Sequence, residues 1–331
     1  MGPKKRGGRQ RLIDTQPHLQ TNFHKVLEDH TAGDPMKPEV VWTNLSVSAI
    51  ADRLAELGTP VDRSIVDQLL DEAKLGRRQA RKTMAMGESK DRNQQFDIIS
   101  FYKELYFDSL NPILSVDTKK RELLGNFYRD GHAFTTQIMR VFDHDYPSFA
   151  DGHVIPHGLY DLKRNRGYIN LGGSCDTSEF ACDSIFHWWS TAGHLAWPQA
   201  YSLLLLCDGG GSNSSTQYLF KQDLQSLANR IGLEIRVAHY PPYTSKYNPI
   251  EHRLFPHVTR ACQGVIFKTV EQVRHYMAKA ATRTGLSVVV NILDKIYEKG
   301  RQVAAGFKDT MPILFDNVLP RFNYRAIPMP Q

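Results

Sequence analysis

Apolar and polar positions along the chain follow two periods, and the change between them predicts two kinds of structure. In residues 46–58 and 62–73 apolar side chains recur three or four positions apart, as on one face of a helix. Short apolar runs at 112–117, 168–171 and 202–207 have the length of strands buried on both faces. The pattern therefore predicts an N-terminal helical unit followed by an α/β domain.

The α/β part is expected to alternate between strands and helices. We predict a strand at 123–128, a long loop region carrying Pro147, Gly152, Pro156 and Gly158, and a helix capped by Asp176 or Thr177. After strand 202–207 the pattern predicts a helix at 220–231, a strand at 234–237, and a helix opened by Asn248 and Pro249. The segment after about residue 285 is expected to add strands or packing elements.

Residues 1–40 read as a basic tail, a short helix and a loop interrupted by Gly33, Pro35 and Pro38. The next two helices are joined by a tight turn at Gly58, which is typical of a helix-turn-helix unit. In that motif the start of the second helix reaches DNA bases, and the residues there are Arg63, Ser64 and Gln68. The same helix carries three acids, which leaves a generic helical hairpin open.

The net charge of +6 is concentrated in two blocks that contain no acid. One lies within residues 4–11, and the other comprises Lys74, Arg77, Arg78, Arg81 and Lys82. Blocks of this kind indicate contact with a polyanion such as DNA. The first block fits a nuclear signal as well as a tail that touches DNA, and the sequence does not decide between them.

Cysteine spacing and hydropathy indicate an intracellular protein. The four cysteines form no CxxC pair and no zinc spacing with histidine, so free thiols are expected. No apolar stretch reaches 18 residues, and the N-terminus lacks the apolar core of a signal peptide. We therefore expect no membrane partner, and location in the cytoplasm or nucleoid if the source is bacterial.

Three acids stand at predicted edges of secondary structure. Asp117 ends the first strand, Asp208 follows strand 202–207 and precedes three glycines, and Glu251 lies in the first turn of the helix opened by Asn248. Each also has a structural interpretation: an aspartate in a turn, or a glutamate in a capping box. Together they can converge to hold two Mg²⁺ or Mn²⁺ ions for phosphoryl transfer.

Basic residues flank these acids, and they suit either phosphate contact or solvated surface. They are Lys119, Lys120, Arg121, Lys246 and Arg253. Two other chemistries are poorly supported. The glycines after Asp208 lack the Lys-Ser/Thr ending of a P-loop, and His252 and His257 do not form an HExxH zinc motif.

Three ordered stretches carry a resemblance to a known family. They are Ser115-Val116-Asp117-Thr118-Lys119-Lys120, Asp208-Gly209-Gly210-Gly211-Ser212-Asn213, and Tyr240-Pro241-Pro242 with Thr244-Ser245-Lys246 through Ile250-Glu251-His252-Arg253-Leu254-Phe255. From about Gly33 to the C-terminus the chain resembles the DDE transposases of the ISAzo13 insertion-sequence family. The resemblance implies a ribonuclease H-like catalytic domain with its acidic triad on Asp117, Asp208 and Glu251. Members of the family carry more sequence before the point that matches Arg9, so we expect a shortened front end here.

These observations predict an α/β protein: a ribonuclease H-like mixed sheet flanked by helices, with an N-terminal all-α helix-turn-helix unit. The expected parts are a basic tail and loop (1–40), a helix-turn-helix unit (41–82), a helical linker (83–111), a catalytic domain (112–285) and a C-terminal extension (286–331).

The predicted function is a DNA transposase that cleaves element ends and joins the 3′-hydroxyl to target DNA with two metal ions. Its partner is DNA, and handling two ends together is compatible with a homo-oligomer on DNA. Two alternatives stay open: a metal-dependent nuclease, and a truncated, inactive remnant that binds DNA.

Overall fold

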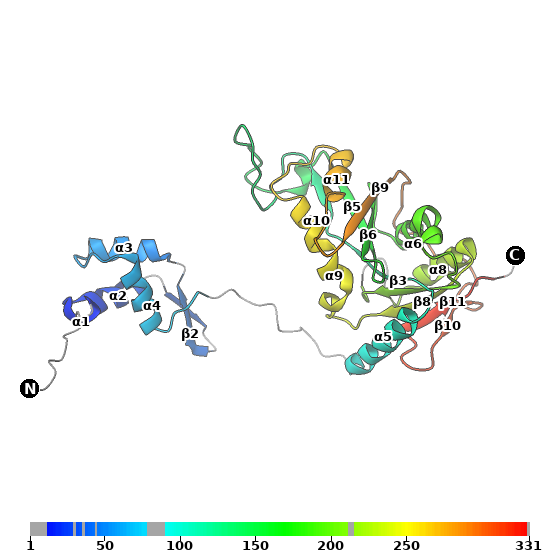
Figure 1. Ribbon diagram of the computed structural model, residues 1–331, viewed down its shortest axis with the longest axis horizontal. Helices are drawn as coiled ribbons and strands as arrows, with labels where there is room; N and C mark the ends of the chain where they lie inside the picture. Colours follow the sequence, from blue (N-terminus) through cyan, green and yellow to red (C-terminus); the bar gives the residue numbers. More distant parts are fainter. Residues whose placement is uncertain are drawn as a thin grey trace, which may run out of the picture. The chain divides into compact units, whose positions relative to one another are not determined.

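Contacts within the chain divide it into two units, one in residues 1–83 and the other in residues 84–331 (Figure 1). The computed structural model describes residues 12–28, 31–34, 37–43, 45–77, 90–210 and 215–329. Arg78, Arg81 and Lys82 of the second basic block lie outside the described residues.

The first unit is built on four helices with one shared apolar core. They are α1 (Leu12–Thr15), α2 (Leu19–Glu28), α3 (Val47–Glu56) and α4 (Arg63–Glu72). As predicted, the Ser46 side chain caps α3 and the Asp62 side chain caps α4, each accepting a hydrogen bond from a backbone N–H of the first turn. Leu19, Phe23, Ile50, Leu54 and Val66 fill the core, so α1 and α2 belong to the same unit as the helix pair.

The prediction of a loop before residue 40 is wrong in part, because the chain forms a β-hairpin there. Strand β1 (Thr31–Asp34) pairs antiparallel with β2 (Lys37–Thr43). Gly33 and Asp34 are turn formers, and they stand where the chain reverses rather than in an extended loop. Pro38 is tolerated because both strands of a two-stranded ribbon are edges.

A nine-stranded mixed sheet forms the centre of the second unit. Its strands are β3 (Ile113–Thr118), β4 (Glu122–Leu124), β5 (Gly152–Asp161), β6 (Arg166–Gly172), β7 (Ser202–Cys207), β8 (Glu234–His239), β9 (Ser287–Leu293), β10 (Leu314–Phe315) and β11 (Asn323–Ala326). The order is β10-β11-β8-β7-β3-β5-β6-β9, with β4 beside β5. Strands β7 and β8 run parallel to β3, and β5 runs antiparallel to both β3 and β6. This is the predicted ribonuclease H-like arrangement.

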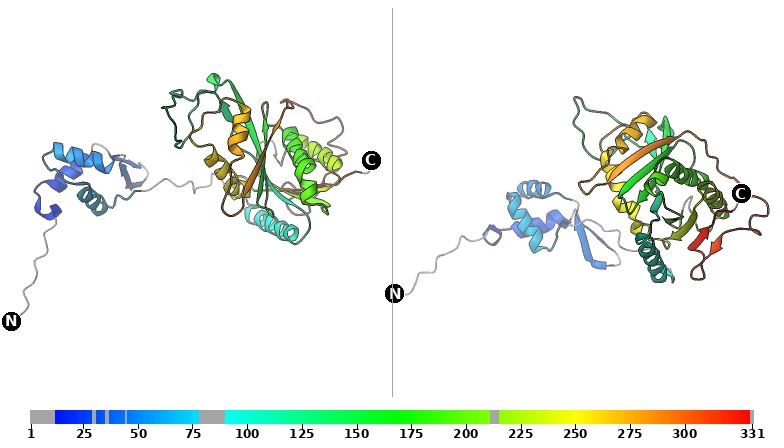
Figure 2. Two further views of the ribbon diagram at one scale, coloured as in Figure 1. Left: turned by 45° about the horizontal axis from the view of Figure 1, so that its top comes forward. Right: turned by 45° about the vertical axis from the view of Figure 1, so that its right-hand side comes forward.

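Helices cover both faces of the sheet (Figures 1 and 2). They are α5 (Arg92–Phe107), α6 (Ser178–Trp188), α7 (His194–Ala196), α8 (Tyr218–Ile231), α9 (Pro249–Arg253), α10 (Phe255–Ala261) and α11 (Val270–Met277). Helices α6 and α8 share one buried cluster with β7 and β8. Helices α5, α9, α10 and α11 share the other with β6 and β9. The single turns η1 (Pro147–Phe149), η2 (Trp189–Gly193) and η4 (Ser245–Tyr247) complete the fold.

The loop predicted around Pro156 and Gly158 is wrong, because both residues lie in the long strand β5. Beside Pro156, β5 passes from its pairing with β4 to its pairing with β3. The Pro156 carbonyl accepts a hydrogen bond from the Lys119 N–H at 2.9 Å. The nitrogen of Pro156, which has no hydrogen to donate, lies on the same side of the strand, at the gap between the two ladders. A central strand thus accommodates a proline without losing a ladder bond. The strand expected at 123–128 is shorter than predicted and ends at Leu124.

The segment after residue 285 adds strands, as expected, and they lie at both edges of the sheet. Strand β9 pairs parallel with β6, while β11 pairs antiparallel with β8. Across the described ranges, no helix has the length and apolar character needed to cross a membrane.

Candidate active site

Asp117 and Asp208 lie side by side because each stands at the end of a buried strand on the same edge of the sheet. Strands β3 and β7 are parallel, and Val116 is in register with Cys207. In each strand the next residue along the chain is an aspartate, Asp117 after Val116 and Asp208 after Cys207. The carboxyl ends of parallel strands are where open α/β sheets bind ligands.

Glu251 is brought to this edge by a helix that is fastened to β3. The Ser115 hydroxyl donates to the Asn248 side-chain oxygen and accepts from the Ile250 N–H at 2.9 Å. The Asn248 amide donates to the Val116 carbonyl at 3.3 Å. These bonds join the first turn of α9 to the residues directly before Asp117.

The capping box predicted for α9 is formed only in part. Asn248 is the N-cap and Pro249 the first helical residue, as expected, but the Asn248 side chain makes no capping bond because it binds β3 instead. The Glu251 carboxyl lies near enough to Asp117 to contribute to the raised pKa of that residue. The bonds to β3 therefore place the start of α9, which carries Glu251, at the edge of the sheet where the two aspartates stand.

Gly158 leaves the space that α9 and α10 occupy. It is paired with Asp117 across β3 and β5. A Cβ atom at Gly158 would lie 2.6 Å from the Phe255 ring and 2.9 Å from the Ile250 side chain. The glycine, which the sequence pattern indicated as a loop former, thus permits the close approach of the helix that carries Glu251.

Neighbouring carboxyl groups and burial raise the pKa of both Asp117 and Asp208. Burial, the Asp208 charge and the hydrogen bond with Glu251 raise the pKa of Asp117 to about 8. Burial and the charges of Glu251 and Asp176 raise the pKa of Asp208, while a hydrogen bond from the Gly210 N–H opposes that rise. Clustered acids that resist ionisation are typical of sites that bind a cation.

The donor chemistry of these residues fits Mg²⁺ or Mn²⁺, which prefer carboxylate oxygens. Through the described ranges, no three His, Cys, Asp or Glu side chains are gathered closely enough to hold a metal ion. The fit therefore rests on the kind and placement of the ligands.

Asp176 is a fourth acid at this edge, and the sequence pattern indicated it only as a helix cap. Thr177 takes that role by accepting from the Phe180 N–H at 3.2 Å. Asp176 instead accepts from the Thr118 hydroxyl at 3.2 Å. Asp117 and Asp208 were selected because they stand at the ends of strands. Asp176 follows strand β6 closely, so the same criterion could have indicated it.

A basic cavity of about 490 Å³ opens beside the acids. It is lined by Thr118, Lys119, Lys120, Arg121, His153, Ile155, Ser174, Cys175, Asp176 and Lys299. Lys119 pairs with Glu122 at 2.7 Å, so part of its charge is neutralised. Among described residues, no acid forms an ion pair with Lys120, Arg121 or Lys299. The cavity thus carries positive charge that is available to an anion.

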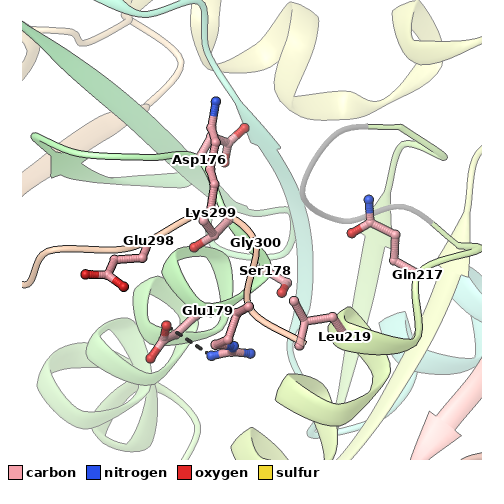
Figure 3. A pocket seen from close by; sticks show the side chains of 10 residues that line it. Asp176, Ser178, Glu179, Gln217, Leu219, Glu298, Lys299 and Gly300 are labelled. Atoms are coloured by element: carbon pink, nitrogen blue, oxygen red, sulfur yellow. Dashed lines mark ion pairs between the residues drawn. The ribbon is translucent and has the colours of Figure 1, made fainter. Parts of the chain in front are cut away.

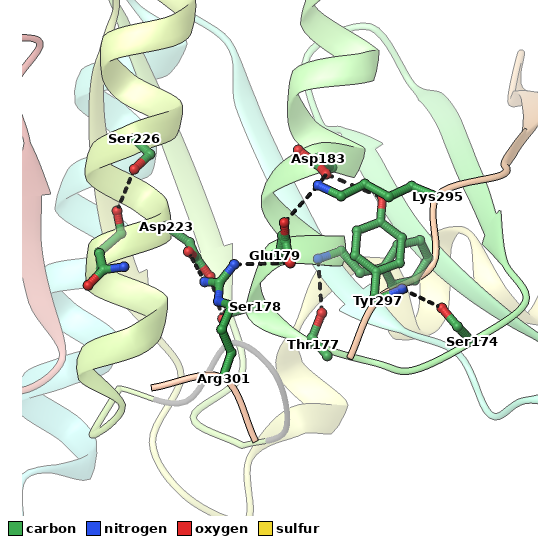
Figure 4. A network of polar contacts seen from close by, with 12 residues as sticks. Ser174, Thr177, Ser178, Glu179, Asp183, Asp223, Ser226, Lys295, Tyr297 and Arg301 are labelled. Carbon is green, nitrogen blue, oxygen red and sulfur yellow. Dashed lines mark hydrogen bonds and ion pairs between the residues drawn. The ribbon is translucent and has the colours of Figure 1, made fainter. Parts of the chain in front are cut away.

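A second cavity of about 360 Å³ lies between the first turns of α6 and α8 and the segment 298–301 (Figure 3). Ion pairs fasten that segment to both helices (Figure 4). Arg301 contacts Asp223 and pairs with Glu179 at 3.0 Å, and Lys295 bridges Glu179 and Asp183 at 2.7 Å. Lys299 belongs to the same segment and lines both cavities. The ion pairs of Arg301 therefore also hold Lys299 at the edge of the basic cavity.

The other predicted DNA contacts within the described residues are exposed. Lys246 lies in η4 directly before α9, and Arg253 ends α9. In the first unit, Arg63, Ser64 and Gln68 lie on the exposed side of α4, and Arg77 is also exposed.

The family of the chain follows from its sequence. The family model described as Rhodopirellula transposase DDE domain matches residues 22–328. The chain therefore belongs to this family of DDE transposases.

Among solved structures, the chain is similar to Mos1 transposase in several complexes. The paired-end complex with left transposon end is 15% identical, covering 83% of this chain and 73% of that one, with a TM-score of 0.44. The Mos1 paired-end complex with Mg gives 14% identity, the same coverage and a TM-score of 0.45. The complex with Mn gives 15%, the same coverage and 0.42. No curated protein matches the chain.

Proposed function

We propose that this chain is a transposase that cleaves phosphodiesters at the ends of its element and joins the 3′-hydroxyl to target DNA. The observation that supports the proposal most is that the elements carrying Asp117, Asp208 and Glu251 end or begin at one edge of the sheet. These residues come from two adjacent strand ends and a helix fastened to the first strand. Family membership supports transposition as the reaction.

In this proposal the carboxylate oxygens of Asp117, Asp208 and Glu251 would hold two Mg²⁺ or Mn²⁺ ions. Such ions, when bound, activate an attacking oxygen and stabilise the leaving one. The protein supplies the positioning. Bonds from Asn248 and Ser115 fix the start of α9, and Gly158 lets that helix lie against the sheet. Burial around Asp117 strengthens its attraction to a cation.

The DNA is proposed to run along the basic cavity of the second unit, and the first unit is proposed to bind DNA as well. Lys119, Lys120, Lys246 and Arg253 are assigned to phosphates near the acids. In the first unit, Arg63, Ser64 and Gln68 are assigned to bases, and Arg77, Arg78, Arg81 and Lys82 to the backbone. Such a reaction takes place inside the cell, and pairing of two ends favours a homo-oligomer on DNA.

The test uses the full chain with labelled DNA that carries the flanks of its own gene, in Mg²⁺ or Mn²⁺. Asp208→Asn removes the proposed ligand with little change of shape, and Asp294→Asn is the control because it changes an exposed acid. We expect cleaved and joined products from the wild type and from the control. We expect loss of about 100-fold or more in Asp208→Asn, as for removal of a group that acts on the transition state.

Other outcomes select the alternatives. Cleavage that is lost in Asp208→Asn but never yields a joined product would identify a metal-dependent nuclease. DNA binding without cleavage at any metal concentration would identify a binding remnant. Joining by Asp208→Asn at the wild-type rate would contradict the assignment of the site.

A further inference from the structure

A buried chain of hydrogen bonds ends on the backbone of Asp208. The His239 ring, at the end of β8, places Nδ1 2.9 Å from the Asp208 carbonyl oxygen and Nε2 2.8 Å from the Tyr324 hydroxyl. A carbonyl can only accept, so Nδ1 carries the proton and donates it to Asp208. Nε2 of the neutral ring then accepts from the Tyr324 hydroxyl. The two partners together fix which nitrogen is protonated.

A second pair of side chains holds the backbone of His239. Gln95 in α5 and Asn323 in β11 exchange amide hydrogen bonds of 2.9 and 2.7 Å. Gln95 also donates to the His239 carbonyl at 2.9 Å. All four residues, Gln95, His239, Asn323 and Tyr324, have a relative exposure of 0%. Buried polar networks whose members are satisfied favour one arrangement over its alternatives.

Asp208 needs such support because the next two residues are glycines. Strand β7 ends at Cys207, and the chain leaves Asp208 through Gly209 and Gly210, which restrict the backbone least. A bond to the Asp208 carbonyl fixes the plane of the peptide that joins Asp208 to Gly209. Because β7 already holds the chain before Asp208, this bond holds the main chain of Asp208 on its other side and so limits where the carboxyl group can lie.

We infer that His239 and Tyr324 are positioning residues that orient Asp208, with Gln95 and Asn323 as their support. The inference rests on the proposed function, since it takes Asp208 as a metal ligand. It assigns a role to α5 and β11, which lie before and after the segment that holds Asp117, Asp208 and Glu251.

The test compares tyrosine hydroxyls near the two ends of strand β7. Tyr324→Phe removes the bond to His239. Tyr106→Phe is the matched control, because the Tyr106 hydroxyl is also buried and bonds Ser202, the first residue of β7, at 2.5 Å. Each full-length variant is measured for melting temperature, for DNA cleavage against Mn²⁺ concentration, and for Mn²⁺ binding by electron paramagnetic resonance. Asp208→Asn defines the Mn²⁺ signal that depends on the site.

We expect Tyr324→Phe to need about 10-fold more Mn²⁺, or to cleave about 10-fold more slowly at saturation, as for outer partners of metal ligands. Tyr106→Phe should lose melting temperature without either effect. His239→Phe should act like Tyr324→Phe or more strongly, and His239→Asn should recover part of the loss because its amide can replace the Nδ1 donor.

The inference is overturned if Tyr324→Phe and His239→Phe match Tyr106→Phe in Mn²⁺ dependence and rate, since the chain would then only stabilise the fold. If the wild type binds Mn²⁺ through Asp208 but cuts no DNA, the proposed transposition fails, and the Mn²⁺ titration still decides the role of His239. Absence of any Mn²⁺ signal that depends on Asp208 would contradict both.

Discussion

At the scale of single residues, Asp117 is placed where its charge is unfavourable for folding. It is partly buried, and two further carboxyl groups lie near enough to raise its pKa. An acid in such a place either keeps its proton or needs a cation nearby. Asp117 therefore lowers the free energy of unfolding of the metal-free protein. Functional residues frequently reduce stability in this way.

Replacing Asp117 by asparagine should stabilise the metal-free protein, and more so at higher pH. The folded-state pKa is raised to about 8 from 3.8, so between about pH 4 and pH 8 the folded chain holds a proton that the unfolded chain has lost. The wild type therefore loses stability as the pH rises through this window. Asp117→Asn lacks that loss, and we expect it to gain about 0.5–2 kcal/mol at pH 8.

Urea unfolding in EDTA at pH 5 and pH 8 measures this difference. Asp294→Asn serves as control, since it changes an exposed acid to the same amide. A gain for Asp117→Asn that is equal at both pH values would mean that the carboxyl is not held protonated. Added Mn²⁺ should stabilise the wild type and not the variant, because only the wild type has the complete set of ligands.

At the scale of elements, the site depends on how closely α9 lies against the sheet. The helix has only five residues and too few turns to be stable alone. It is held by the bonds from Ser115 and Asn248 and by the contacts of Ile250 and Phe255 over Gly158. A change of side chain at Gly158 therefore acts on the position of Glu251.

Gly158→Val should lower both stability and cleavage. Even a Cβ atom would lie within 2.6 Å of the Phe255 ring. Overpacking of this kind typically destabilises by about 1–3 kcal/mol. Because the same displacement moves α9, we expect cleavage to fall by about 10-fold or more at a temperature where the variant is folded.

Gly173→Ala is the control for this substitution, because a Cβ there meets no atom within 4 Å. Its stability should stay within about 0.5 kcal/mol of the wild type. Thermal unfolding and cleavage are measured on the same samples. A stable Gly158→Val protein with wild-type cleavage would show that the approach of α9 does not set the geometry of the acids.

At the scale of the whole molecule, the sequence predicts single helices and strands better than it predicts which of them lie side by side in the fold. The apolar runs of β3 and β7 and the caps Ser46 and Asp62 are local signals, and the structure has them where predicted. Strand β5 was missed because proline usually excludes a central strand, and Pro156 is accommodated there only because it lies beside a gap between two ladders. That gap is a property of the sheet and has no local signal.

The same limit applies to the candidate site. Local sequence patterns alone left Asp208 in a turn and Glu251 in a capping box as open alternatives, and the resemblance to a family joined them to Asp117. Asp176 carried the same positional signal but no family motif. The bonds from Gln95 to His239 and to Asn323 link residues 144 and 228 positions apart, so no local pattern could indicate them.

The charge distribution of the second unit gives a prediction about DNA binding. Lys120, Arg121 and Lys299 stand at the carboxyl edge of the sheet, beside the acids. Lys279 and Arg283 are equally exposed but precede β9, whose first residue lies at the opposite edge. If DNA runs along the basic cavity, only the first group contributes phosphate contacts.

Lys120→Ala with Arg121→Ala should therefore weaken DNA binding and reduce its dependence on salt. Each lost phosphate contact lowers the slope of log Kd against log salt by about 0.9. The double variant Lys279→Ala with Arg283→Ala removes the same charge and should leave the slope unchanged. Equal effects of both double variants would mean that net charge alone attracts the DNA, because a general attraction does not distinguish the two edges of the sheet.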